Sequence, residues 1–325
     1  MKFEDTEQKY VEEALVLALE EYGIECTKCP QLMKRSFEKE LEIIIQRLFN
    51  NKYGKVAVEN GKIIGYLAFE GPWDGFHGNV KGVFSPLGGS AFSGDNRNVL
   101  ASKLLQEVAA DLVADGVCSF ALSRYAHDEE VGRSFVMNGF GIRCSDAIMK
   151  LSTRTKISEL NEDIRFQELG KDDKREISRL RKELIKHLCS SPAFFPTKIT
   201  QYDNWFENDR IRVFVAKEKN KVIGYMSLDT EAETFVSESD NIYNICGAYV
   251  DKEHRNKGIA QQLLEYLCEI SEKEGMEYLG VDCETLNPTA LRFWSKYFDN
   301  YTYSYARRID ERVLGYDKYL ENEWN

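Results

Sequence analysis

The chain has 325 residues, of which 43% are apolar and 30% are charged, and its formal net charge is −11. This composition is typical of a globular protein with one large or two mid-sized domains. The acidic balance argues against a general binder of nucleic acid or anionic membranes, which would need a basic surface. No apolar run reaches the roughly 18 to 20 residues of a membrane-spanning helix. We expect neither nucleic acid nor membrane as a partner.

The N-terminal stretch and the cysteines favour a cytoplasmic location. Residues 1–21, MKFEDTEQKYVEEALVLALEE, are charged and helix-patterned, unlike a signal peptide. The eight cysteines are thinly spread, and we expect reduced thiols. Cys26 and Cys29 form a lone C-x-x-C pair, and the four histidines lack the spacing of zinc ligands. We therefore expect no metal.

The first half predicts a series of helices and strands. Helices are expected over 5–22 and 31–50, followed by a hairpin in VAVENGKIIGYLAF, residues 56–69. A long strand and a glycine-rich polar loop at 85–98 come next. A helix then runs over 100–116 with Gly116 as its C-terminal cap. A strand at 117–123 and a helix at 130–140 complete this half.

The second half repeats this order. Its elements are a helix at 171–189, a hairpin at 213–228, a strand at 241–251, helices at 259–275 and 288–298, and strands at 278–284 and 301–310. Gly65 and Gly224, Leu104 and Leu263, and Phe135 and Trp294 all lie 159 residues apart. One spacing shared by three landmarks indicates a tandem duplication. The boundary is expected in polar residues 152–162, which gives domains 1–155 and 156–325. The element order favours an α/β fold (α+β), each domain having a mixed, mostly antiparallel sheet flanked by helices.

The stretch KEHRNKGIAQQLL, residues 252–264, predicts a strand-to-helix turn that binds an anion. The first amides of a helix lack carbonyl partners and carry partial positive charge, which suits phosphate. Gly258 allows close backbone approach, and Arg255 and Lys257 add charge. The alternative is a solvated helix start. However, basic residues at that end oppose the helix dipole, so chance would favour Asp or Glu there.

The same stretch resembles motif A of the GNAT-superfamily acetyltransferases, with its R/Q-x-x-G-x-G/A signature. Arg255, Gly258 and Ala260 occupy its three fixed positions, and NPTALRFW, residues 287–294, is similar to the next family motif. The resemblance covers roughly residues 160–325. The first half places Asn96, Val99 and Ala101 against the signature, without the arginine or the glycine. It therefore resembles a degenerate copy in a tandem member.

The resemblance implies a binding site for acetyl-CoA as cosubstrate. By that match, the pyrophosphate cradle consists of Arg255, Asn256, Lys257, Gly258, Ile259 and Ala260. The pantetheine arm would pair with the strand at Ala248, Tyr249 and Val250, with the Val250 amide donating to the thioester oxygen. Asn287 matches an asparagine that binds the pantetheine arm, although a capping role is its alternative.

The sequence offers several candidates for the groups that transfer protons. The family often has a tyrosine acid where this chain has Trp294, so Tyr297 is the candidate acid, with water as the alternative. Many members carry a carboxylate base where this chain has Asn244. Asp240 and Glu284 are the candidate bases. Tyr243, Tyr249 or a water chain to a distant carboxylate could serve instead.

The expected function is acetyl-CoA-dependent N-acetylation of a primary amine, on a small molecule or a peptide, by direct attack. Trp294 and Asn244 leave open a second interpretation, an acyl-CoA-binding protein or sensor without turnover. A third is a transferase for a larger acyl donor. We expect a monomer or a homodimer.

Overall fold

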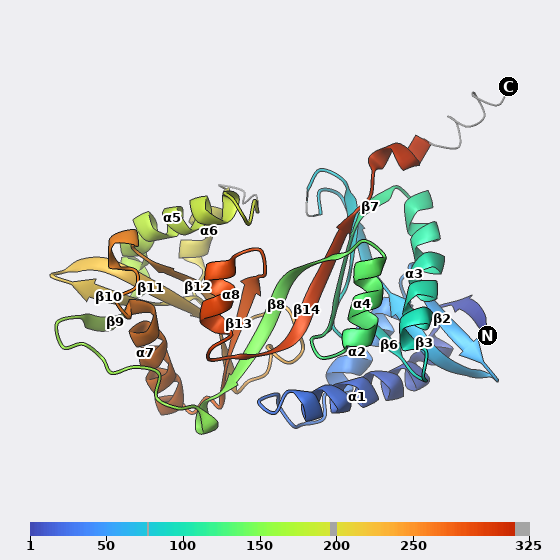
Figure 1. The fold of residues 1–325 in the computed structure, drawn as a ribbon, viewed down its shortest axis with the longest axis horizontal. Coiled ribbons are helices and arrows are strands. Elements are labelled where there is room, and N and C mark those ends of the chain that lie inside the picture. The colour runs from blue at the N-terminus through green and yellow to red at the C-terminus, as the bar shows by residue number, and fades with distance from the viewer. Residues whose placement is uncertain (77, 196–199, 316–325) are drawn as a thin grey trace. The chain divides into compact units, whose positions relative to one another are not determined.

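The computed structural model describes residues 1–76, 78–195 and 200–315. The chain forms two compact units (Figure 1). Unit 1 comprises Met1–Ser145 and the segment that begins at Asn300, and unit 2 comprises Asp146–Asp299. Within the described ranges, no helix combines the length and the apolar character needed to cross a membrane.

Unit 2 is built on a mixed sheet with the strand order β8-β13-β12-β11-β10-β9. The strands are β8 (Gly141–Lys150), β9 (Arg165–Leu169), β10 (Arg212–Glu218), β11 (Lys221–Asp229), β12 (Ile242–Val250) and β13 (Tyr278–Glu284). Neighbours from β9 to β12 are antiparallel, whereas β12 and β13 are parallel. The predicted mixed, mostly antiparallel sheet is confirmed here.

Helices cover both faces of the unit 2 sheet (Figure 1). They are α5 (Ser178–Cys189), α6 (Thr200–Glu207), α7 (Ile259–Lys273) and α8 (Pro288–Trp294). Side chains alternate along a strand, so Val213 and Val215 of β10 pack in one core with Leu180 of α5. Phe214 of the same strand packs in the other core with Leu263 of α7. The sheet is therefore buried on both sides, which holds its backbone in place.

Unit 1 contains two sheets rather than the single sheet we predicted. One has the order β1-β2-β3-β6, and the other includes β4-β5-β7-β14. The strands are β1 (Lys2–Asp5), β2 (Gly54–Glu59), β3 (Lys62–Ala68), β4 (Glu70–Trp73), β5 (Lys81–Ser85), β6 (Ser90–Phe92), β7 (Val117–Tyr125) and β14 (Asp299–Arg308). The expected long strand is split into β5 and β6, because Pro86 has no amide proton and its carbonyl accepts from Gly89 N–H at 2.7 Å in a tight turn.

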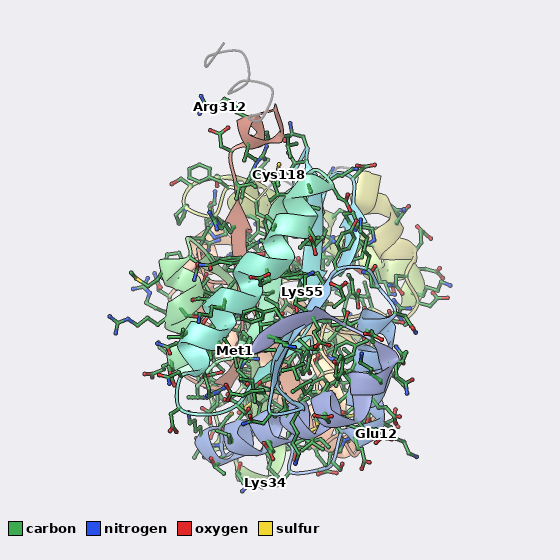
Figure 2. All side chains as sticks on the ribbon, turned by 90° about the vertical axis from the view of Figure 1, so that its right-hand side faces the viewer. Met1, Glu12, Lys34, Lys55, Cys118 and Arg312 are labelled. Carbon is green, nitrogen blue, oxygen red and sulfur yellow. The ribbon has the colours of Figure 1, made fainter. Side chains whose placement is uncertain are left out.

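Four α-helices pack on these sheets: α1 (Val11–Lys28), α2 (Glu38–Phe49), α3 (Arg97–Ala114) and α4 (Glu129–Met137). In Figure 2, α3 crosses this side of the unit with Lys55 of β2 beside it. Lys55 forms ion pairs with Asp111 of α3 at 2.7 Å and with Asp5 of β1 at 2.6 Å. Leu104 and Leu105 of α3 are buried in the core beneath.

The compact units differ from the predicted domains 1–155 and 156–325, which describe the sequence repeat. Strand β14 is the last strand of the second repeat but pairs antiparallel with β7 in unit 1, Tyr305 opposite Leu122. The end of β8 belongs to unit 2, where Ala147 and Met149 enter the core and the Leu151 amide donates to Glu277 at 2.9 Å. Each unit therefore takes its last strand from the other repeat.

We predict that two aromatic residues, seven positions apart, stabilise different units. Tyr305 is buried in the core of unit 1 with its ring 6.0 Å from Phe135, and Phe298 is buried in the core of unit 2. Tyr305→Ala should cost about 3 kcal/mol and lower hydrogen-exchange protection in β7. Phe298→Ala should instead lower hydrogen-exchange protection in α7 and β11. Loss of protection in β11 after Tyr305→Ala would contradict the strand exchange.

Candidate functional site

The site begins where strands β12 and β13 separate. Their parallel pairing runs from Ile242–Tyr278 to Ile245–Val281 and ends there, although both strands continue. On its other edge β12 stays paired with β11, and Asp251 N–H donates to Ile223 C=O at 2.8 Å. Hydrogen-bonded and non-bonded pairs alternate in an antiparallel ladder. The N–H and C=O groups of Ala248 and Val250 therefore point into the gap between β12 and β13.

The gap leads to the N-terminus of α7, where the backbone forms a cradle. Gly258 is the N-cap residue with φ +79°, and Asn256 has φ +61°. No side chain in the described structure caps α7, so its first amides face outward. A Cβ at Gly258 would meet only Gln262 Nε2, at 3.5 Å. Gly258 is therefore required by backbone conformation rather than by space.

Arginine 255 joins the cradle to the strand. Its Nε donates to the Val250 carbonyl at 3.2 Å, and its guanidinium lies 5.0 Å from the centre of the Tyr249 ring. The side chains of Arg255 and Lys257 are exposed at the rim. Positive charge beside outward amides suits a phosphate or pyrophosphate group.

The cradle, the strand gap and the helices α5, α7 and α8 line one cavity of about 610 Å³. Its walls include most of the residues predicted to bind the cofactor: Ala248, Tyr249, Val250, Arg255, Asn256, Gly258, Ile259, Ala260 and Asn287. Leu184 and His187 of α5 and Trp294 of α8 are also among its wall residues. Lys257 alone of the predicted set is not a wall residue.

Asn287 is held by two hydrogen bonds at the start of α8. Its Oδ1 accepts from Ala290 N–H at 3.4 Å and lies 3.2 Å from His187 Nε2. Because the Ala290 amide can only donate, this oxygen is an acceptor and His187 Nε2 carries the proton. Within the described structure only the oxygen of this side chain is engaged, which leaves the Asn287 Nδ2 group as a donor in the cavity wall.

A carboxylate at the point of separation was missed in the sequence. Asp282 directly follows Val281, the last β13 residue paired with β12. Its side chain is exposed and is not one of the residues that line the cavity, although protein atoms crowd its surroundings. This crowding, with the negative charge of Glu233, raises its pKa to about 6. A base with that pKa is suited to work near neutral pH.

The predicted catalytic residues are placed less favourably. Asp240 is exposed before the start of β12, at the end of the strand opposite the cradle. Glu284 ends β13 and is half-buried. Tyr297 packs against Phe293 with ring centres 5.3 Å apart and does not line the cavity, and burial raises its pKa. These three roles stay predictions that the geometry does not support.

The polar residues of β12 are engaged in contacts away from the cavity or are poor bases. Asn244 Nδ2 donates to the Ser237 carbonyl at 2.8 Å, and Tyr243 Oη donates to Glu274 at 2.9 Å. Burial raises the pKa of Tyr249. Among the described side chains, no group of three or more His, Cys, Asp or Glu is placed to hold a metal ion.

Unit 1 corrects one sequence interpretation. Val99, placed against Gly258, lies inside α3, which begins at Arg97. Arg97 Nε donates to the Phe92 carbonyl at 2.9 Å, as Arg255 Nε does to Val250. The arginine is therefore present, one position from where the spacing of 159 placed it, and the prediction of its loss was wrong. The cradle is absent because the helix begins earlier.

Comparisons with known proteins agree with this geometry. Residues 181–299 match the model of the acetyltransferase (GNAT) family. A solved GCN5-related N-acetyltransferase from Sphaerobacter thermophilus is 14% identical, with a TM-score of 0.60 over 94% of this chain and 95% of that one. A tandem GNAT protein from the clavulanic acid biosynthesis pathway is 12% identical, with a TM-score of 0.50 over 94% and 98%. No curated protein matches the chain in sequence.

A third solved structure is a GCN5-related glucosamine N-acetyltransferase region of a fungal multi-domain β-N-acetylglucosaminidase. It is 16% identical, with a TM-score of 0.55, and the match covers 94% of this chain and 38% of that one. At these identities the solved structures show the fold. The match to the acetyltransferase (GNAT) family lies in unit 2, and the solved structures show that the chain as a whole has the fold of a tandem GNAT protein.

Proposed function

We propose that unit 2 is an acetyl-CoA-dependent N-acetyltransferase that acts on a primary amine of a small molecule or peptide. The observation that carries the proposal is one continuous cavity, lined by the cradle at Gly258 and by the strand gap at Ala248 and Val250. A cradle of amides with adjacent cations fits a pyrophosphate. The open strand edge fits a pantetheine arm, because its peptide-like amides can pair with a strand.

The chain's own groups can support direct attack. Bound acetyl-CoA supplies the activated thioester. Asp282 can take the ammonium proton from the acceptor amine, and the Ala248 and Val250 amides can stabilise negative charge on the carbonyl oxygen. Crowding by protein atoms raises the pKa of Cys246 to about 11, so its thiol stays protonated and is a poor nucleophile. In this proposal the acceptor amine attacks the thioester carbonyl directly, the new amide bond forms, and coenzyme A leaves as a thiolate that takes a proton from water.

Asp282 favours an enzyme over a sensor. The case for a protein without turnover rested on Trp294, where the family often has a tyrosine acid, and on Asn244, where many members have a carboxylate base. Asp282 answers only the second of these points. Asp282 supplies a carboxylate on the neighbouring strand, where β12 and β13 part. A larger acyl donor stays an alternative, and competition between acetyl-CoA and longer acyl-CoAs would reveal it.

We predict that Gly258→Val abolishes stabilisation by acetyl-CoA. Saturation at about a hundred times Kd should add about 2.7 kcal/mol to the native chain. Valine disfavours φ +79° and places branched carbons in the cradle. The measurement is thermal unfolding with and without ligand. Gly275→Val is the matched control, because Gly275 has φ +82° just beyond the other end of α7.

Both variants should lose similar intrinsic stability, but only the Gly275 variant should keep the ligand-induced shift. If the native chain shows no shift, unit 2 does not bind acetyl-CoA and the proposed function fails. If the Gly258 variant keeps the full shift, the cradle is not the binding site.

We predict that Asp282→Asn lowers kcat/KM by about 10² to 10⁴. In the native enzyme only the deprotonated form accepts the proton. Since the pKa is about 6, kcat/KM should fall about tenfold for each pH unit below 6 and level off above 7. Asp240→Asn is the control and should leave the profile unchanged. A native profile flat from pH 5 to 8 would rule out Asp282 as the base.

We predict that His187 positions Asn287 through its Nε2–H. His187→Leu removes this bond and should raise KM for acetyl-CoA about fivefold, with little change in kcat. A fivefold change corresponds to about 1 kcal/mol, the usual net free energy of one hydrogen bond. His187→Gln keeps a donor near the same place and should restore the native KM. Equal KM values for the two variants would show that the hydrogen bond is not used.

A further inference from the structure

Unit 1 contains a strand edge equivalent to that of the unit 2 site. Ser93 N–H donates to Ile64 C=O at 2.9 Å, as Asp251 N–H does to Ile223 C=O. The next residues pair in the same way, Gly65 with Phe92 and Gly224 with Val250. By this register Phe92 corresponds to Val250, and Ser90 corresponds to Ala248. The Phe92 and Ser90 backbone groups therefore point away from β3 into an equivalent slot.

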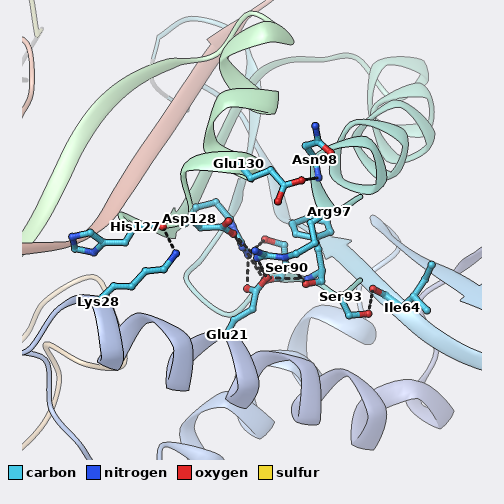
Figure 3. A network of polar contacts seen from close by, with 12 residues as sticks. Glu21, Lys28, Ile64, Ser90, Ser93, Arg97, Asn98, His127, Asp128 and Glu130 are labelled. Carbon is cyan, nitrogen blue, oxygen red and sulfur yellow. Dashed lines mark hydrogen bonds and ion pairs between the residues drawn. The ribbon is translucent and has the colours of Figure 1, made fainter. Parts of the chain in front are cut away.

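In unit 1, side chains form hydrogen bonds with these backbone groups (Figure 3). Phe92 N–H donates to Glu21 Oε1 at 3.0 Å, and the Ser90 carbonyl accepts from Arg124 Nη1 at 2.7 Å. The Phe92 carbonyl accepts a hydrogen bond from Arg97 Nε at 2.9 Å. The Glu21 carboxylate therefore accepts from the Phe92 amide, which corresponds to the Val250 amide, the proposed donor to the thioester oxygen. The Arg124 guanidinium donates to the Ser90 carbonyl, which corresponds to the carbonyl of Ala248.

The occupying groups form a buried network of balanced charge. Arg124 is 1% exposed and binds both oxygens of Glu21, at 2.8 and 2.9 Å, and Asp128 at 2.5 Å. Arg97 bridges the same two carboxylates, at 2.9 Å to Glu21 and 2.7 Å to Asp128. Burial alone would raise the pKa of Asp128, but the two guanidinium groups outweigh it and the pKa is lowered. Each guanidinium is therefore paired with both carboxylates.

Among the described residues of unit 2, no equivalent of this network is found. The strand registers place Phe3 of β1 and Phe166 of β9 at equivalent positions, and the same spacing puts Leu184 at the position of Glu21. The spacing of 159, which holds after the hairpins, places Cys283 at the position of Arg124. Neither side chain offers a carboxylate or a guanidinium to the strand edge. The same spacing pairs Asp128, which binds the two arginines, with Asn287, which lines the unit 2 cavity.

We propose that Glu21 is an internal ligand of unit 1. Its carboxylate fills a subsite for a small monocarboxylate, formed by Arg97, Arg124 and the Phe92 amide. In unit 1, the slot beside β6 that corresponds to the strand gap of unit 2 is thus filled by a side chain of the protein itself. The comparison with a thioester rests on the function proposed for unit 2. The carboxylate subsite rests only on the contacts of unit 1.

The test is rescue of a Glu21→Ala variant by free carboxylate. Removing Glu21 leaves buried guanidinium charge without a partner and should lower the Tm of unit 1 by about 10 °C. Saturating sodium acetate should enter the vacated space and restore at least about half of that loss. Sodium chloride at equal ionic strength should not. Two-dimensional NMR of the Phe92 amide would place the bound acetate.

Two variants separate a built subsite from a general salt effect. Glu13→Ala removes another α1 carboxylate, which accepts from the Ile63 amide at 2.8 Å, and acetate should not stabilise it. Glu21→Gln keeps the volume filled and should lose stability without rescue. If acetate and chloride act alike on Glu21→Ala, or if acetate rescues all three variants equally, the proposal is overturned.

A further measurement needs no Glu21 variant and covers the case in which Glu21→Ala does not fold. Titration of the native chain with acetyl-CoA should give at most one site per chain, and Gly258→Val should give none. A second acetyl-CoA site in the native chain, or acetyl-CoA binding that shifts the NMR signal of the Phe92 amide, would show that the unit 1 slot is open, which overturns the proposal. If the native chain binds no acetyl-CoA but acetate rescues Glu21→Ala, the unit 2 function fails and the internal ligand stands.

Discussion

The structure depends on the separation of two parallel strands inside a buried sheet. Where β12 leaves β13 after Ile245, the amides and carbonyls of the strand edge lose their sheet partners. Buried backbone groups of this kind need other partners. Everything that defines the site lies along this break: the cradle at its mouth, Asn287 on its wall and Asp282 where the strands part.

The two units satisfy the same requirement in different ways. Unit 1 fills its strand edge with Glu21 and Arg124 from its own α1 and β7. Unit 2 leaves the edge open to a cavity. A duplicated fold can therefore keep its backbone while one copy exchanges a ligand for a salt-bridge network. Such a network needs several charged residues to be introduced together, because an unpaired buried charge is strongly destabilising.

Much of the fold and the cradle could be predicted from the sequence, because their signals are local. The helix beginning at Ile259 follows from apolar periodicity, and Gly258 follows from the need for positive φ. The short strands β1, β4 and β9 were missed because they gain their partners from distant segments. The glycine-rich stretch at 85–98 was predicted to be a loop, yet it contains the buried strand β6.

The catalytic groups were harder to predict than the cradle. Asp282 carries no motif, and its importance comes from the register at which β12 and β13 part. Its position on the face of β13 opposite Val281 and Cys283 could have indicated that it is not a core residue. His187 becomes relevant only when the end of α5 meets the start of α8. Tyr297 fitted the helical spacing, but α8 ends at Trp294 and the ring packs aside.

The exchange of final strands also constrains how the chain is made. Strand β14, which completes the β7 edge in unit 1, is encoded after all of unit 2. A ribosome therefore releases β7 long before its partner exists, and the open edge must wait while an entire second unit is synthesised. Unit 2 receives the end of β8 early and can close first. Unit 1, which contains the first residues of the chain, can therefore be completed only after unit 2 has been translated.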